Sequence, residues 1–377
     1  MLPADAMKAE LHALELIRVA LPLKTPFRTS FGTETDRDIL LVKAITSEGE
    51  SWGECVAGVS PAYSSEYISG AQQVITEFLA PKLFSAGALT AAQVAPLLDS
   101  IKGHRMAKAA VEMAVLDAEL RSSGQSFAGF LGGVSDFVDT GVSVGIHDNI
   151  GELLDTVDGY VDEGYMRIKL KIEPGSDIDQ VRAVREKFGP DVLLQVDANT
   201  AYRLSDARHL ARLDEYDLLL IEQPLPEEEV RAHAELAKMV RTPICLDESI
   251  VSSQAAADAI AMGACSIVNI KAGRVGGYLE ARSVHDVCAG HGVPVWCGGM
   301  LETGVGRAAN VALASLPNFT LPGDTSASDR YWATDITEPF VLENGRIRVP
   351  TGPGLGREPI PEILKEVTTS TETVRPG

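Results

Sequence analysis

The 377-residue sequence predicts an α/β protein in which a TIM-like barrel follows an N-terminal α+β domain. Short apolar runs alternate with helical stretches in the second half of the chain, and acidic or basic residues recur once per repeat where the runs end. Before about residue 135, segments of alternating polarity are instead typical of antiparallel strands. Together, these three observations indicate the α/β class with a separate α+β domain at the N-terminus.

Residues 1–135 form the first predicted domain. The segment Ile39–Ile45 has the composition of an antiparallel strand, whereas Met106–Arg121 carries apolar residues at helical spacing. Strands and helices in one segment indicate an α+β domain.

Residues 136–333 form the predicted barrel. Parallel strands need crossover connections that cover both faces of the sheet, so eight strand and helix repeats close most simply into a barrel. A doubly wound open sheet would place a glycine-rich phosphate loop after its first strand, and Gly141–Gly145 has no such pattern. The eight predicted strands are Gly141–Ile146, Arg167–Ile172, Leu193–Val196, Leu218–Ile221, Ile244–Leu246, Ser266–Ile270, Val293–Cys297 and Phe319–Leu321.

Residues 334–377 are rich in proline and glycine around Thr351–Gly356. This segment is expected to return to the first domain and brace it. Its last part, Thr368–Gly377, is expected to be frayed.

The composition excludes several classes of partner. The formal net charge of −20 argues against binding to nucleic acid or to an anionic membrane. The five cysteines contain no CxxC pair, which fits a reduced compartment better than a disulfide framework. Met1–Lys8 shows no basic segment leading into an apolar one, and no run reaches the roughly 18 apolar residues of a membrane helix. We therefore expect a cytoplasmic protein.

Three acids and two flanking lysines mark the predicted site. They stand at positions 171, 197, 222, 247 and 271, at intervals of 26, 25, 25 and 24 residues, close to one strand and one helix each. The acids Asp197, Glu222 and Asp247 follow three neighbouring strands, where catalytic groups of barrels lie. Three such carboxylates repel one another unless a cation lies among them, and oxygen ligands favour Mg²⁺ or Mn²⁺. The alternative is that the acids cap helices or form salt bridges.

The lysines predict proton transfer. Lys169 and Lys171 are two residues apart on one strand and point to the same face, while Lys271 ends the sixth strand on the opposite side of the ring. Burial and neighbouring cations lower the pKa of a lysine towards that of a usable base. Lys169 is expected to act in this way on Lys171, and Arg274 on Lys271, unless Arg274 is a solvated loop residue.

These parts predict a reaction on a small carboxylate substrate. The cation binds the substrate carboxylate, a lysine removes the proton from the adjacent carbon, and an enediolate forms. With a lysine on each face, the outcome could be racemisation, cycloisomerisation or β-elimination. A Schiff-base lysine aldolase and a barrel without catalytic activity are the alternatives from other classes. The aldolase would not need the three acids, and the barrel without activity would not need lysines on opposed strands.

The combined motif resembles the muconate-lactonising subgroup of the enolase superfamily. Within it, four further segments are similar to the o-succinylbenzoate synthase / N-acylamino acid racemase family, whose synthase makes a menaquinone precursor. The resemblance implies a (β/α)₇β barrel, a capping domain completed by the C-terminal segment, and a homo-oligomer of two to eight subunits. The segments are Pro26–Gly32, Gly103–Ala107, Trp296–Met300 and Leu321–Thr325.

The resemblance also implies roles for individual residues. Asp197, Glu222 and Asp247 match the metal ligands, Lys171 the proton-abstracting base and Lys271 its partner, with Lys169 beside them. Arg274 and Glu248 are expected directly behind these groups. The positions that match the substrate pocket and its capping loop are Ser143, Asn199, Gly299, Met300, Leu301, Phe27 and Phe31.

Three features distinguish this chain from other members of the superfamily or leave its substrate open. Gly58 stands where relatives can carry a bulkier side chain, which leaves the pocket size open. Dipeptide epimerases use paired acids at the last strand, and Asp324 here lacks a partner. None of the seven histidines stands at a matching strand end, which argues against a mandelate-racemase type of base.

Overall fold

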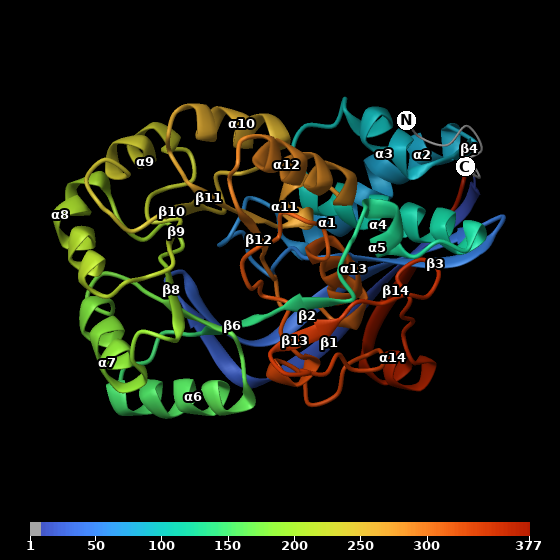
Figure 1. The fold of residues 1–377 in the computed structure, drawn as a ribbon. Coiled ribbons are helices and arrows are strands. Elements are labelled where there is room, and N and C mark those ends of the chain that lie inside the picture. The colour runs from blue at the N-terminus through green and yellow to red at the C-terminus, as the bar shows by residue number, and fades with distance from the viewer. Residues whose placement is uncertain (1–8) are drawn as a thin grey trace.

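The computed structural model describes residues 9–377 (Figure 1). The N-terminal residues examined for a signal sequence lie outside them. Within residues 9–377, no helix is long and apolar enough to cross a membrane. In the same part of the chain, the five cysteines are all buried and free.

The first part of the chain, together with a strand from its C-terminal end, forms an antiparallel sheet packed against helices. Its strands lie in the order β14-β1-β2-β3, and β4 pairs with β1. The predicted strand and helix lie within β2 and α4. The elements are β1 (Ala9–Thr29), β2 (Gly32–Thr46), β3 (Gly49–Cys55), β4 (Ala88–Leu89), α1 (Ile68–Val74), η1 (Ile75–Leu79), α2 (Ala80–Ser85), α3 (Ala91–Leu98), α4 (Arg105–Ser123), α5 (Phe127–Leu131) and β14 (Thr368–Val374). We refer to them as the capping domain.

The second part of the chain is a curled sheet of seven parallel strands in the order β12-β11-β10-β9-β8-β7-β6. The strands are β6 (Gly141–Val144), β7 (Arg167–Lys171), β8 (Leu193–Asp197), β9 (Ile221–Glu222), β10 (Ile244–Leu246), β11 (Ile267–Ile270) and β12 (Val295–Cys297). The helices around them are α6 (Ile150–Glu163), α7 (Ile178–Phe188), α8 (Ala207–Leu210), α9 (Val230–Leu236), α10 (Ser253–Ala261), α11 (Ala272–Val275), α12 (Tyr278–Gly290) and α13 (Gly304–Ala314), with short turns η2 (Leu204–Asp206), η3 (Ala211–Glu215) and η4 (Ser328–Arg330).

The eighth predicted strand is wrong as a regular element. Phe319–Leu321 forms one parallel bridge to β12, at Val295, and the chain then bridges Thr140 at Gly323. The main-chain N–H of Gly141 also donates to the carbonyl of Gly323, at 2.8 Å. The segment therefore joins both edges of the sheet and closes the ring without the ladder that defines a strand.

The C-terminal segment returns to the capping domain, but its end is not frayed. After β13 (Arg346–Arg348), which pairs with β5 (Phe137–Asp139), and α14 (Pro361–Val367), the chain enters β14. Strand β14 pairs antiparallel with β1 along its length, from Leu14 opposite Val374 to Val19 opposite Thr368. Main-chain hydrogen bonds to a partner far away in sequence order this segment, which its polar composition does not reveal.

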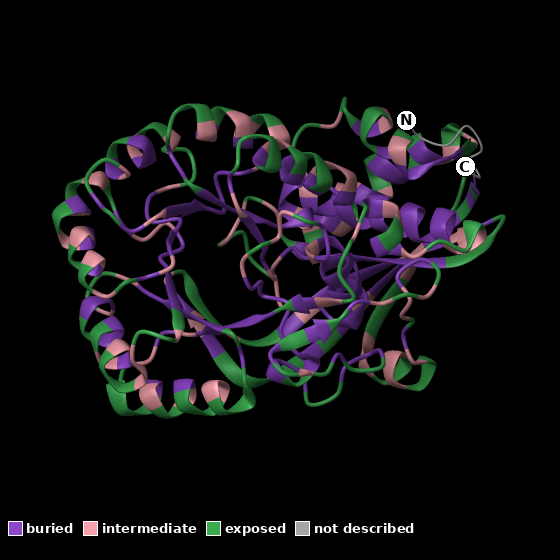
Figure 2. Cartoon of the chain, in the orientation of Figure 1, coloured by how far each residue is buried: buried purple, intermediate pink, exposed green. Residues whose placement is uncertain are grey.

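Buried glutamates connect the two parts of the chain. Glu54 on β3 accepts hydrogen bonds from the N–H groups of Thr303 and Gly306 at the start of α13. Glu112 on α4 accepts from Tyr278 and Leu279 at the start of α12. Figure 2 shows that the barrel strands and most of α4 are buried, whereas barrel helices such as α6 and α7 have exposed outer faces. Two barrel helices thus begin on carboxylates of the capping domain.

Candidate active site

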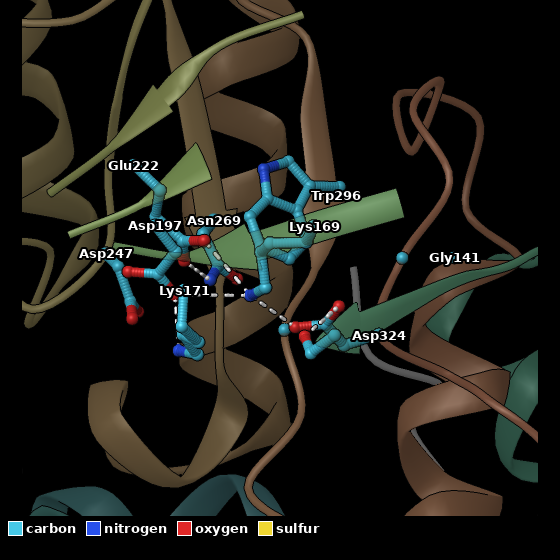
Figure 3. A network of polar contacts seen from close by, with 12 residues as sticks. Gly141, Lys169, Lys171, Asp197, Glu222, Asp247, Asn269, Trp296 and Asp324 are labelled. Atoms are coloured by element: carbon cyan, nitrogen blue, oxygen red, sulfur yellow. Dashed lines mark hydrogen bonds and ion pairs between the residues drawn. The ribbon is translucent and has the colours of Figure 1, made fainter. Parts of the chain in front are cut away.

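The strand ends bring the predicted acids and lysines together (Figure 3). In the buried strand β7, alternation places Arg167, Lys169 and Lys171 on one face and two aliphatic side chains on the other. Lys171 is paired in register with Asp197 at the end of β8, and Asp197 with Glu222 at the end of β9. One ammonium and two carboxylates therefore stand side by side on three adjacent strands.

Each of the three acids contacts a cationic side chain. Lys171 Nζ lies 2.6 Å from Asp197 Oδ2. Lys169 Nζ lies 3.0 Å from Glu222 Oε2 and 3.4 Å from Asp197 Oδ2. On the other side, Lys271 Nζ lies 2.8 Å from Asp247 Oδ2. Salt bridges, predicted from the sequence as the alternative to metal binding, are therefore present at all three acids, and the acids are almost completely buried.

Burial and ion pairing shift the pKa values of these acids in opposite directions. Burial raises the pKa of the Asp197 carboxyl, but the ammonium groups of Lys171 and Lys169 outweigh it, so the pKa lies below its usual value. Burial and the charge of Asp197 raise the pKa of Glu222. The same two causes raise the pKa of Glu248 to about 7. A common set of charges thus keeps Asp197 ionised and favours protonation of its neighbours.

The pKa of Lys271 is raised, whereas the sequence predicted a lowered value. Burial lowers it, but the Tyr63 hydroxyl and the carboxyl groups of Glu222, Glu248 and Asp197 around the ammonium outweigh burial. Arg274 itself is buried rather than solvated and forms a close ion pair with Asp247. The predicted lowering of the Lys271 pKa is wrong because the sequence does not show how many carboxylates face this lysine.

The donor set fits a divalent cation, although the side chains do not converge in this structure. Within residues 9–377, no three acidic, histidine or cysteine side chains are grouped so that they could hold a metal ion. The acids Asp197, Glu222 and Asp247 face lysines and Arg274 instead. Their six carboxylate oxygens are nevertheless hard ligands from adjacent strand ends, the type that Mg²⁺ and Mn²⁺ prefer. Glu248, next along the chain, has a buried Oε2 atom without a hydrogen-bond partner.

A cavity of about 290 Å³ opens above these groups, between the barrel and the capping domain. Its walls include the three lysines but none of the three acids, which lie below. All seven residues predicted to bind substrate line it: Phe27, Phe31, Ser143, Asn199, Gly299, Met300 and Leu301. Glu248 and Arg274 lie behind the wall, as predicted for residues that support the site.

Asn199 connects the two ends of the site. Its Oδ1 accepts a hydrogen bond from Lys171 Nζ at 2.7 Å, and its Nδ2 donates to Glu248 Oε1 at 3.0 Å. The backbone of Asn199 has a φ of 40°, a conformation that occurs often at functional sites and that asparagine tolerates. The loop after β8 therefore fixes the direction of the Lys171 side chain.

Several residues of the site were missed from the sequence. Tyr63, from a capping-domain loop, accepts a hydrogen bond from Lys271 Nζ at 3.1 Å and donates to Asp247 at 3.2 Å. Asn269 donates to Glu222 Oε1 at 2.6 Å and stands two residues before Lys271, so strand alternation could have identified it. No local pattern identifies Tyr63, because only the packing of one domain on the other brings it there.

The Trp296 ring lies beside the Lys169 side chain (Figure 3), and Arg167 contacts the same ring. Lys169 Nζ lies 4.7 Å and Arg167 Cζ 5.2 Å from the centre of the Trp296 ring. Both cations also bind Asp324, at 2.7 Å from Lys169 Nζ and 2.9 Å from Arg167 NH2. Asp324, noted from the sequence only as an acid without a partner, thus supports Lys169.

Two family models match most of the chain. Residues 13–132 match the mandelate racemase / muconate lactonizing enzyme N-terminal domain, and residues 152–363 match the enolase C-terminal domain-like family. Both matches agree with the predicted order of capping domain and barrel. The boundaries near residues 135 and 333 stay predictions.

Individual relatives are similar over nearly the whole chain. The N-succinylamino acid racemase of Amycolatopsis sp. is 69% identical over 96% of this chain and 98% of its own. The o-succinylbenzoate synthase of Geobacillus kaustophilus is 47% identical over 93% of this chain and 94% of its own. Among solved structures, an enolase superfamily member from Listeria innocua is 42% identical with a TM-score of 0.93, over 97% of this chain and 99% of its own.

Proposed function

Because the chain belongs to the enolase superfamily, we propose that it removes the proton next to a substrate carboxylate, acting as an o-succinylbenzoate synthase, an N-succinylamino acid racemase or both. The intermediate is an enediolate. One observation carries the proposal most strongly: Lys171 and Lys271 line a single cavity from strands of the ring that are separated by β8, β9 and β10.

In racemisation, the two lysines act on opposite faces of the α-carbon. Lys171 takes the proton from one enantiomer, and Lys271 delivers a proton to the other face; the roles reverse for the other enantiomer. Lys171 is directed by Asn199 and Asp197, and Lys271 by Tyr63 and Asp247. Each lysine is thus held by two hydrogen-bond partners. This orients one ammonium group towards each face of the α-carbon before the substrate binds.

In the synthase reaction, the proton and a hydroxyl leave from the same face of the substrate. Lys171 takes the proton and returns it to the departing hydroxyl, so that water is released. Lys271 stays cationic and stabilises the negative charge that develops on the enediolate, which suits its raised pKa. The same two side chains therefore support both reactions.

Enzymes of this superfamily depend on a divalent metal. Asp197, Glu222 and Asp247 are the residues proposed to hold it here, with Mg²⁺ as the proposed ion. Bound there, it supplies positive charge beside the substrate carboxylate and makes the neighbouring proton more acidic. Lys169, held by Asp324, keeps a further positive charge at the base of the cavity. Assembly into a homo-oligomer stays a prediction.

Direct assay with Mg²⁺ tests the proposal. The purified chain is expected to dehydrate the cyclohexadiene carboxylate precursor of o-succinylbenzoate or to racemise N-succinylamino acids. The Lys171→Ala variant should lose both activities while its circular dichroism spectrum shows that it remains folded. Absence of both activities in the wild-type chain, over several amino acids, would contradict the proposed function.

A further inference from the structure

Arg37 is a buried cation in the cavity for which the proposed chemistry has no task. It lies on β2 in the capping domain, its side chain is 4% exposed, and it lines the cavity. Its hydrogen bonds are long: NH1 lies 3.4 and 3.3 Å from the two Glu34 oxygens, and NH2 lies 3.2 Å from the Met300 carbonyl. Its buried Nε has no partner. Guanidinium groups usually bind at shorter distances, so this one has unused capacity.

The other cations of the cavity are already engaged. Of the described side chains that line it, the cationic ones are Arg37, Lys169, Lys171 and Lys271. The lysines come from the barrel and bind the buried carboxylates at its floor. Arg37 has no contact with those acids and stands on the capping-domain wall, beside Gly58. The cavity therefore has a positive group at its cap as well as at its floor.

The relatives act on molecules that carry two carboxylates. A succinyl group on an amino nitrogen ends in a free carboxylate, and so does the succinyl chain of o-succinylbenzoate. The floor of the cavity takes the carboxylate next to the reacting carbon. The second carboxylate then needs a cation elsewhere in the same cavity, because a buried charge without a partner is costly.

We propose that Arg37 binds this second, distal carboxylate and makes the enzyme selective for acyl groups that end in a negative charge. The inference rests on the proposed function and adds to it a binding residue outside the reacting centre. Glu34, the present partner of Arg37, is 36% exposed at the cavity rim, so it can turn towards water when a carboxylate replaces it. An arginine suits the task because its planar fork can bind both carboxylate oxygens.

Arg37 could instead serve only to fasten β2 to the loop that contains Met300. That role predicts equal damage to the turnover of every substrate when Arg37 is replaced. Recognition of a carboxylate predicts damage confined to substrates that carry it, because a polar group without its partner penalises one substrate and not the other.

The experiment compares two acyl groups of four carbons, one charged and one neutral. Racemisation of N-succinyl-L-phenylalanine and of N-butanoyl-L-phenylalanine is followed by polarimetry in the full chain with Mg²⁺, for the wild type, Arg37→Met and Arg37→Lys. Lys43→Met is the matched control, because Lys43 is a cation of the same strand whose partners, Glu15 and Glu50, lie outside the cavity.

The wild type is expected to prefer the succinyl substrate. Arg37→Met should reduce that preference in kcat/KM about tenfold or more, mainly through KM, as the loss of a hydrogen bond to a charged group does. Arg37→Lys should retain part of it, and Lys43→Met all of it. The inference is overturned if Arg37→Met lowers the preference for the succinyl substrate less than fivefold relative to the wild type. It is also overturned if the wild type prefers the butanoyl substrate. A wild type that acts on neither and makes no o-succinylbenzoate overturns the proposed function instead.

Discussion

Replacing Gly141 with alanine should destabilise the protein, although it adds a single methyl group. Gly141 on β6 stands opposite Arg167 on β7. A Cβ atom at Gly141 would lie 2.5 Å from both Cζ and Nε of Arg167 and 2.8 Å from its carbonyl oxygen. Contacts below 3.0 Å cannot persist, so either the two strands separate or the guanidinium of Arg167 moves away.

The magnitude depends on which of these happens. Overpacking that is relieved by a backbone shift costs about 1–3 kcal/mol. Displacement of Arg167 would also break its buried ion pair with Asp324 and its contact with Trp296, and breaking such a pair costs about 3–5 kcal/mol. We therefore expect Gly141→Ala to lower the free energy of unfolding by about 1–5 kcal/mol. Activity should fall as well, because Asp324 also holds Lys169.

Thermal and urea unfolding measure the effect, with Gly159→Ala as the matched control. Gly159 lies within α6, and a Cβ there meets nothing within 4 Å. The control should gain about 0.5–1 kcal/mol from the better helix propensity of alanine. Adding Arg167→Ala to Gly141→Ala should cost less than the sum of the two single changes, because the clash is then partly absent. Wild-type stability in Gly141→Ala, or full additivity in the double variant, would refute the reasoning.

Three further predictions concern the lysine, the metal and a buried acid. Lys271→Ala should lose racemisation by a factor of about 10² or more while one enantiomer still exchanges its α-proton in D₂O, as NMR can follow; near-normal racemisation would contradict the two-base assignment. Treatment with EDTA should abolish activity and Mg²⁺ or Mn²⁺ should restore it, so full activity after treatment would exclude the metal. Burial raises the pKa of Glu112 from 4.5 to about 7, so the folded state holds an extra proton between these pH values and stability falls as the pH rises through them. Glu112→Gln should therefore lose about 3 kcal/mol less than the wild type between pH 4.5 and 8 in unfolding experiments, whereas the exposed control Glu186→Gln should follow the wild type; equal slopes in all three would contradict the reasoning.

The features that depend on local periodicity were predictable from the sequence. Alternation in β7 placed Lys169 and Lys171 on one face, and the regular intervals placed Asp197 and Glu222 at neighbouring strand ends. The same rule applies to Arg167 and Asn269, which were missed although they stand two residues from a predicted site lysine. Strand period alone was sufficient for these positions.

Features that depend on distant partners were not predictable. The segment Phe319–Leu321 has the composition of a strand, but it forms only single bridges because the ring closes there. Tyr63 and Arg37 reach the cavity through the docking of the capping domain, which no local pattern encodes. The raised pKa of Lys271 likewise reflects the sum of many charges in three dimensions.

The pairing of β14 with β1 constrains how the molecule is made on the ribosome. Leu14 faces Val374, which is synthesised 360 positions later (374 − 14), after the barrel sheet. One edge of β1 therefore stays unpaired along Leu14–Val19 until Thr368–Val374 have been synthesised, and unpaired strand edges are sites of misassembly. A capping domain that folds before the rest of the chain is synthesised would lack β14. The barrel must therefore leave the exit tunnel before the sheet of the capping domain can be completed.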